Sequence, residues 1–312
     1  VIPTPSSYPA PRSAKTALTA AMTTCISVNG TLGDEKSATI SVLDRGFLYG
    51  DSVYEVLRTY GGEPFALKEH LDRLERSAEL LEIALPISRD TLVEEIRACM
   101  AAAGNVESYV RIIITRGGGP ISLDPALATD PNRVIIVTPL KTLDAEVYET
   151  GVKVCLVNAG RSAEGQLPAG AKSGNYLTNL LALRVAKQAG AHEALLVDAH
   201  GRICEGSSSN VFIVVRGAKA EGETQGLTIR TPPLEVGILE GITRHKVLEL
   251  AQTLGYPVEE VDLGPDDLRA AQEVFLTSTI REVLAVTQVD ETTIGDGRPG
   301  PVAQALRRAF VA

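Results

Sequence analysis

Strand-like and helix-like patterns fall into two successive groups along the 312-residue chain, and the interruption between the groups constrains the fold more than any other feature. The first group ends with the β-branched run Val134 to Thr138, and the second starts at Val152. Because each group holds both strands and helices, and because 312 residues exceed the usual size of one domain, we predict two α+β domains with a boundary near residue 145.

The first group begins with strands and turns. Residues 25–42 alternate around the turn dipeptide Asn29-Gly30, which predicts a β-hairpin with arms at 25–28 and 38–42. A strand at 52–60, a turn at Gly61-Gly62 and a return strand at 64–67 follow. Apolar residues at three- and four-residue spacing then predict helices over 67–85 and 91–103. Strands at 110–115 and 134–138 enclose a loop, 117–132, that is long enough to border a pocket.

The second group predicts helices over 176–188 and 243–254, the latter ended by Gly255, and strands over 193–197 and 211–215. We therefore assign residues 22–140 to a small N-terminal domain, 141–150 to a linker and 151–312 to a larger C-terminal domain. Residues 1–21 are rich in Pro, Ser and Ala and contain no acid, so we interpret them as a disordered or vector-derived extension outside the fold.

Charge and cysteine spacing exclude several classes of function. The net charge is -9 and no Lys/Arg-rich tract occurs, which argues against a nucleic acid or an anionic membrane as partner. No apolar run is long enough to span a bilayer. The four cysteines are widely scattered, which favours reduced thiols in a cytoplasmic protein over disulfides or a zinc site. We expect no metal, and small molecules as the partners.

The familiar motifs of metalloproteases, P-loop proteins, serine hydrolases and dinucleotide-binding proteins are absent. The segments that remain are LDRGFLYGDSVYEVLR (43–58), EHLDR (69–73), TRGGG (115–119), AKSGNY (171–176), EGSSSNVF (205–212), GITR (241–244) and TSTIREV (277–283). Over residues 24–310 their order and spacing resemble the class IV (fold type IV) aminotransferases, which include branched-chain and D-amino-acid aminotransferases and the related aminodeoxychorismate lyase. The resemblance implies a two-domain homodimer with its active sites at the subunit interface, pyridoxal 5'-phosphate as cofactor, and ping-pong transfer of an amino group.

By this resemblance, Lys172 is the catalytic lysine, which forms the Schiff base with the cofactor. The chemistry needs an amine of lowered pKa to form that bond, and the freed amine then moves the substrate proton. Glu205 is the acid that faces the pyridine nitrogen and keeps it protonated. Without the neighbouring motifs, one lysine or one acid would be read as a solvated surface charge.

The remaining cofactor-binding residues follow from the same resemblance and from the chemistry of phosphate. Ile242 and Thr243 begin a predicted helix whose free N–H groups favour an anion. Arg73 offers a planar guanidinium, and Tyr176 corresponds to the tyrosine near the cofactor's phenolic oxygen in branched-chain enzymes. The hydroxyl and amide groups that complete the predicted set belong to Ser208, Ser278 and Thr279.

Substrate recognition requires a cation for the substrate carboxylate, and the candidates are Arg58, Arg111 and Arg116, with Tyr54 as a phenol partner. Tyr109-Val110-Arg111 resembles the Tyr-Ile-Arg of branched-chain enzymes, whereas EGSSSNVF resembles the corresponding motif of the D-amino-acid enzymes. Arg116 corresponds to the carboxylate-binding arginine of the latter, but Gly118 replaces their histidine. The sequence is therefore a mosaic, in which we favour the branched-chain L-amino acid type.

Three alternatives stay open. A D-amino acid or (R)-amine transaminase would have the same fold, because the stereochemistry depends on how the pocket orients the carboxylate. An aminodeoxychorismate lyase is disfavoured by Tyr54-Glu55, which matches the aminotransferases. A non-enzymatic cofactor-binding protein would be expected to lack Lys172 or Glu205.

Overall fold

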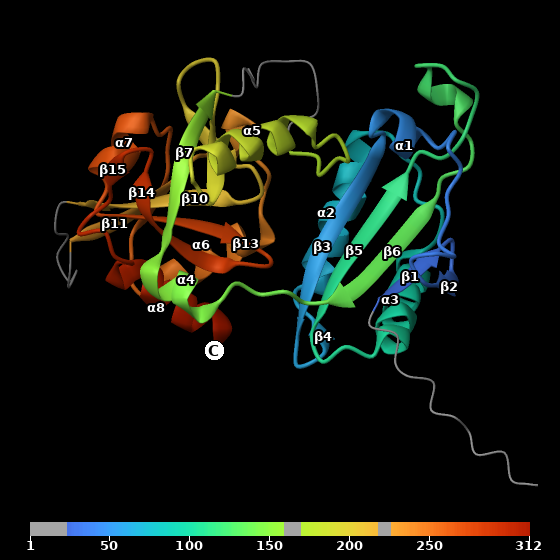
Figure 1. The fold of residues 1–312 in the computed structure, drawn as a ribbon, viewed down its shortest axis with the longest axis horizontal. Coiled ribbons are helices and arrows are strands. Elements are labelled where there is room, and N and C mark those ends of the chain that lie inside the picture. Colours follow the sequence, from blue (N-terminus) through green and yellow to red (C-terminus); the bar gives the residue numbers. More distant parts are fainter. Residues whose placement is uncertain (1–23, 159–169, 218–225) are drawn as a thin grey trace, which may run out of the picture.

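A computed structural model describes residues 24–158, 170–217 and 226–312, and its elements form two sheets with helices around them (Figure 1). The expected extension, 1–21, lies outside the described residues. Among the described residues both halves mix helices and strands, in agreement with the predicted α+β class. We propose that the two sheets are the cores of two domains.

The first sheet has the strand order β2-β1-β6-β5-β3-β4. Its elements, with the helices beside it, are β1 (Cys25–Val28), β2 (Thr31–Gly33), α1 (Arg45–Tyr49), β3 (Ser52–Tyr60), β4 (Glu63–Pro64), α2 (Leu67–Leu80), α3 (Arg89–Ala103), β5 (Ser108–Thr115) and β6 (Arg133–Pro139). Helices α2 and α3 cover one face of this sheet, and the apolar residues between them and the strands, such as Leu57, Leu74 and Ile96, form the core. The other face of β3 and β5 carries side chains, Tyr54 and Arg111 among them, that line a cavity together with residues of the second half.

The second sheet has the order β12-β11-β10-β13-β14-β7-β8-β9, with β15 paired to β14. Its elements and helices are α4 (Ala145–Thr150), β7 (Val152–Asn158), α5 (Leu177–Gln188), β8 (Glu193–Val197), β9 (Ile203–Gly206), β10 (Asn210–Arg216), β11 (Leu227–Thr231), α6 (Ile242–Thr253), β12 (Val258–Glu260), α7 (Pro265–Ala270), β13 (Glu273–Ser278), β14 (Glu282–Val289), β15 (Thr292–Thr293) and α8 (Pro301–Val311). Val211 and Phe212, adjacent in β10, belong to different core clusters, so both faces of this sheet are covered. That explains the continuous apolar runs of its strands.

Local predictions were wrong at two places. The second arm of the hairpin ends at Gly33, because Asp34 accepts hydrogen bonds from the backbone of Lys36 and Ser37 and turns the chain, so residues 38–42 are not a strand. The return strand predicted at 64–67 is only Glu63–Pro64, since α2 already begins at Leu67 and ends at Leu80. Helix α4 lies within the expected linker, 141–150, whose place between two domains stays a prediction.

All four cysteines are free thiols, three of them buried. The cytoplasmic location inferred from them stays a prediction. Within the described ranges, no helix combines the length and apolar character needed to cross a bilayer.

Candidate active site

A cavity of about 500 Å³ lies between the two sheets, with walls from both halves of the chain. The N-terminal half contributes strands β3 and β5 and helix α2. The C-terminal half contributes the segment before α5, the turn after β9, the first residues of α6 and the turn between β13 and β14. The predicted residues that line it are Tyr54, Arg73, Arg111, Lys172, Tyr176, Glu205, Ser208, Ile242, Thr243, Ser278 and Thr279.

Lys172 is anchored on the N-terminal half, although it follows the linker in the sequence. Its carbonyl accepts a hydrogen bond from the Tyr54 N–H at 3.0 Å, and its own N–H donates to the Ser77 hydroxyl at 3.1 Å. Two residues later Gly174 donates to the Ser52 carbonyl, and a Cβ at Gly174 would collide with the Ser52 hydroxyl. The AKSGNY segment is therefore docked along β3, which fixes the backbone of Lys172.

The surroundings of Lys172 favour a neutral amine. Its Nζ lies 3.5 Å from the Tyr54 hydroxyl and 4.5 Å from the centre of the Tyr54 ring. Burial of the amine, reinforced by the positive charge of Arg73 and opposed by Glu55 and Glu205, lowers the pKa of Lys172 to about 8. An amine with that pKa is partly unprotonated near neutral pH and can act as a nucleophile or a base.

Glu205 lies near the end of β9 and is held by the opposite wall of the cavity. Its Oε2 accepts a hydrogen bond from the N–H of Leu239 at 3.0 Å. The Leu239 carbonyl accepts one from the Asn210 side chain at 2.9 Å, and a Cβ on Gly241 would collide with that side chain. The EGSSSN and GIT motifs therefore fix each other, so that Glu205 and the start of α6 have one set position.

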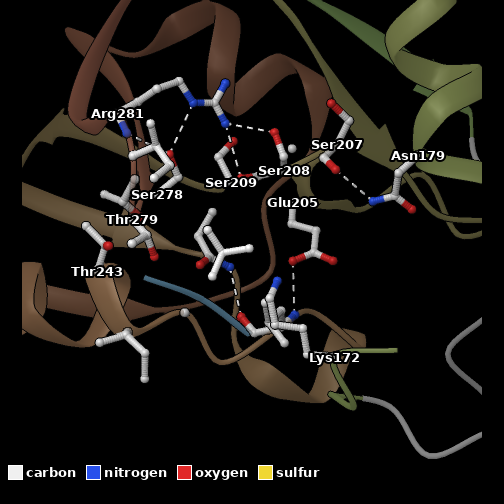
Figure 2. A pocket seen from close by; sticks show the side chains of 18 of the residues that line it. Lys172, Asn179, Glu205, Ser207, Ser208, Ser209, Thr243, Ser278, Thr279 and Arg281 are labelled. Atoms are coloured by element: carbon white, nitrogen blue, oxygen red, sulfur yellow. Dashed lines mark hydrogen bonds between the residues drawn. The ribbon is translucent and has the colours of Figure 1, made fainter. Parts of the chain in front are cut away.

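The start of α6 and the turn after β13 form one end of the cavity. Figure 2 shows Thr243, Ser278 and Thr279 close together at this end, with Lys172 and Glu205 farther away. The Thr243 hydroxyl is buried and has no hydrogen-bond partner among the described residues, and the same holds for Ser209 and Thr277, which also line the cavity. The N–H groups at the start of an α-helix lack partners within the helix as well. This end offers unpaired donors to an anion.

Arg73 reaches the cavity from α2, and Glu55 fixes its direction. Its Nε and one terminal nitrogen donate to the two carboxylate oxygens of Glu55 at 2.7 and 2.8 Å, and its other terminal nitrogen donates to the Glu240 carbonyl at 2.8 Å. Burial alone would raise the pKa of Glu55, but Arg73 and His70 hold it at about 2. The guanidinium has five N–H donors, so it keeps donors for another ligand.

The sequence reasoning missed a second buried acid, Glu193, and the arginine that it binds. Glu193 is fully buried at the start of β8 and forms an ion pair with Arg281, which lines the cavity. Arg281 also donates to the hydroxyls of Ser278 and Ser208 at 3.1 and 2.9 Å (Figure 2). The signal was an acid at the head of the apolar strand sequence EALLV, because an acid in such a strand requires a partner.

Of the four predicted substrate residues, the structure brings Tyr54 and Arg111 into this cavity. The Arg111 guanidinium lies 4.2 Å from the centre of the Tyr54 ring and forms no ion pair within the described part of the chain. Arg58 pairs with Glu282 outside the cavity at 2.7 Å. Arg116 pairs with Asp51 at 2.8 Å and donates to two backbone carbonyls. Neither Arg58 nor Arg116 is available to a ligand in this cavity.

Comparisons with known proteins agree on one family. The family model described as amino-transferase class IV matches residues 52–289. The chain belongs to the class IV aminotransferases. It is 34% identical to the D-alanine aminotransferase of Bacillus licheniformis, over 90% of this chain and 94% of that protein. It is 32% identical to the branched-chain-amino-acid aminotransferase of Escherichia coli, over 90% of each chain.

Solved structures confirm the predicted fold type of this class IV aminotransferase. The T.th. branched-chain amino acid aminotransferase, solved with pyridoxamine 5'-phosphate, superimposes with a TM-score of 0.84 at 34% identity, over 92% of each chain. The predicted mosaic is confirmed as well, since relatives of both the branched-chain and the D-alanine type match nearly the whole chain. Among the described residues no cluster of His, Cys, Asp and Glu could hold a metal ion.

Proposed function

We propose that this class IV aminotransferase binds pyridoxal 5'-phosphate in the cavity and transfers amino groups between branched-chain L-amino acids and 2-oxo acids in a ping-pong cycle. The observation that carries the proposal is the position of Lys172. Its amine of lowered pKa lies in the same cavity as Glu205 and as hydroxyls that have no hydrogen-bond partner in the described part of the chain. A surface lysine would have none of these neighbours.

The donors in the cavity fit a phosphorylated pyridine. Ile242, Thr243, Ser278 and Thr279 would hold the phosphate with N–H and hydroxyl groups, and Arg73 would add a positive charge. Three buried cavity hydroxyls without a partner among the described residues support this assignment, because an unpaired buried hydroxyl is costly and a phosphate oxygen satisfies it. When bound, the cofactor supplies an electron-withdrawing ring that stabilises negative charge at the substrate Cα.

The chain's own groups would direct the protons. The Glu205 carboxylate, fixed by the Leu239 N–H, would hold a proton on the pyridine nitrogen. The neutral amine of Lys172 would remove the proton from the substrate Cα and return one to the cofactor carbon. Tyr54, 3.5 Å from that amine, and Tyr176, whose ring meets the Tyr54 ring edge to face, would limit its directions of approach.

Arg111 is the residue we assign to the substrate carboxylate. It lies on β5 opposite Val56 of β3 and has no carboxylate partner among the described residues. Tyr54, Val56, Tyr109 and Leu143 line the cavity near these strands and give it an apolar wall suited to an aliphatic side chain. A D-amino acid transaminase is the second candidate, and the relative of Bacillus licheniformis together with the sequence EGSSSN favours it.

We also propose that the working enzyme is a homodimer. Large apolar side chains are exposed on α1, on the loop after β5 and on α5, among them Phe47 at 66%, Ile121 at 77% and Leu177 at 63%. A Cβ added to Gly50, which ends α1, would lie 3.4 Å from the backbone of Asn175 just before α5, so α1 and the start of α5 adjoin at the edge of the active-site segment. Large exposed apolar side chains that gather on neighbouring segments mark surfaces that bind another protein.

The proposal is tested with the purified protein, reconstituted with pyridoxal 5'-phosphate and given L- and D-amino acids and (R)-1-phenylethylamine, with pyruvate or 2-oxoglutarate as acceptor. We expect the highest kcat/KM with L-leucine, L-isoleucine or L-valine. Activity on the D-series alone would replace the branched-chain assignment by the second candidate. Release of pyruvate from aminodeoxychorismate without an amino acceptor would instead indicate the lyase.

A further inference from the structure

One face of β3 has two different surroundings along its length. Side chains alternate across a strand, so Tyr54, Val56, Arg58 and Tyr60 share a face. Tyr54 and Val56 line the active-site cavity. Arg58 and Tyr60, the next two on that face, lie outside it and both bind Glu282 of β14, at 2.7 and 2.8 Å. Strand β3, which with β5 forms the wall assigned to the substrate (the substrate wall), is thus attached to the C-terminal half where the cavity ends.

Glu282 has an unusual backbone conformation and a buried side chain. Its φ is +58°, in the left-handed region that residues other than glycine rarely occupy. Its side chain is buried, and it directly follows Arg281, which lines the cavity and bonds Ser278. A strained residue persists only where its surroundings hold it. Here the bonds to the N-terminal half hold Glu282, the first residue of β14, directly after the turn that we assign to the phosphate.

The pair is ionic and withdrawn from water, with side-chain exposures of 8% for Arg58 and 7% for Glu282. Burying both charges carries a desolvation cost, so such a pair is poor evidence of stability, and its best-attested use is to specify one arrangement. Other contacts orient the same groups. The Arg58 guanidinium stacks 4.1 Å from the centre of the Tyr60 ring, and Arg307 approaches the second oxygen of Glu282 at 3.8 Å.

We propose that Arg58 and Glu282 are a positioning pair for the reaction. The pair sets the distance between the substrate wall on β3 and β5 and the phosphate turn between β13 and β14. Arg58 therefore acts through the geometry of the cavity and does not bind the substrate carboxylate. This inference rests on the proposed function of the same cavity.

The test compares three variants: Glu282→Gln, Arg58→Met, and the double variant with both changes. Each single variant leaves one buried charge without its partner, whereas the double variant removes both charges and should recover much of the lost thermal stability. We expect KM for both the amino and the oxo acid, and the dissociation constant of pyridoxal 5'-phosphate, to rise about tenfold in the single variants. In the double variant these constants stay raised while the stability recovers.

Lys246→Ala is the matched control, because Lys246 of α6 pairs with Glu69 of α2 at 3.4 Å and so joins the same two halves at the surface. It should leave both constants within about twofold. If KM and the dissociation constant of the double variant return to the wild-type values together with its stability, the pair is merely structural and the proposal is overturned. Constants that never change in the single variants would overturn it as well.

The cofactor measurement separates this proposal from the proposed function. It follows the absorbance of bound pyridoxal 5'-phosphate and requires no turnover. A wild-type protein that binds the cofactor but transaminates no substrate would refute the proposed function. The cofactor dissociation constants of wild type and variants would still test whether Arg58 and Glu282 position the cavity walls. A wild-type protein that binds no pyridoxal 5'-phosphate would refute both.

Discussion

The two ends of the active-site cavity are built by different means. At the end assigned to the phosphate, the ligating groups belong to the start of α6 and to the turn between β13 and β14, where the short hydroxyl side chains of Thr243, Ser278 and Thr279 lie close together. At the substrate end, the groups are long side chains on the face of two paired strands, Tyr54 on β3 and Arg111 on β5. The first end depends on local chain geometry, and the second on the packing of one sheet against the other half of the chain.

The arginines at the two ends also differ, because those at the phosphate end are paired with acids and the one at the substrate end is not paired among the described residues. Arg73 and Arg281 are each held by a buried acid, Glu55 and Glu193. Arg111 has an aromatic ring beside it and no acid among the described residues. A guanidinium fixed by an internal acid has a preset direction, which suits a cofactor that stays bound. An unpaired guanidinium retains its charge for a substrate carboxylate that enters and leaves.

Lys172→Ala should have the largest effect, because this residue stands between the two ends and serves both. Removing a general acid–base group lowers turnover by roughly 10²–10⁴-fold. The phosphate end is untouched, so the variant should still bind pyridoxal 5'-phosphate, as measured by equilibrium dialysis, while single-turnover assays show the loss. Lys36→Ala, at an exposed lysine, is the control and should behave as wild type. Undiminished turnover in Lys172→Ala would refute the assignment of the lysine.

The lowered pKa of Lys172 also predicts a pH-dependent stability of the cofactor-free protein. Below pH 8 the amine is protonated in both the folded and the unfolded state, and the folded state bears the full cost of burying the charge. Between pH 8 and 10.5 the unfolded state binds more protons, so stability rises with pH. Relative to Lys172→Met, wild type should gain about 3 kcal/mol across this range, measured by urea unfolding. A constant difference between the two proteins would contradict the lowered pKa.

Much of the fold could be predicted because the periodic patterns are local. Strand β3 was predicted with its observed bounds, 52–60, and β5, β6, α3 and α5 within a few residues. The hairpin was predicted wrongly because one side chain, Asp34, redirects the backbone after Gly33. The pairing of β1 with β6 brings together residues more than a hundred positions apart, and no periodicity contains that information.

The same distinction separates the site residues that were predicted from those that were missed. Thr243 and Ser278 are recognisable because a helix start or a turn places its own residues. Arg58, Arg111 and Arg116 all occur on or beside strands in the sequence, and only the pairing of β3 with β5 and the approach of β14 determine which one enters the cavity. Glu193 was missed because its partner, Arg281, lies 88 residues away.

Arg111→Gln should change the substrate end alone. A hydrogen bond to a charged group contributes about 1.5–3 kcal/mol, so kcat/KM for amino and oxo acids should fall roughly 10- to 100-fold. The dissociation constant of pyridoxal 5'-phosphate should remain unchanged, since Arg73 carries the charge assigned to the phosphate. Arg97→Gln, at an arginine of α3 that is exposed and paired with Glu63, is the control. A parallel fall in cofactor affinity would show that the two ends are not independent.

Thr243→Val should have the smallest effect, and its sign should depend on the cofactor. The hydroxyl is buried without a partner among the described residues, so replacing it by a methyl group should leave the cofactor-free protein equally stable or up to about 1 kcal/mol more stable. With pyridoxal 5'-phosphate bound, the lost hydrogen bond should raise the dissociation constant about 2- to 10-fold. Thr253→Val on the same helix, where the hydroxyl bonds the Glu249 carbonyl at the surface, is the control. Thermal unfolding with and without cofactor measures both effects, and a loss of stability in both states would mean that Thr243 supports the fold rather than the phosphate.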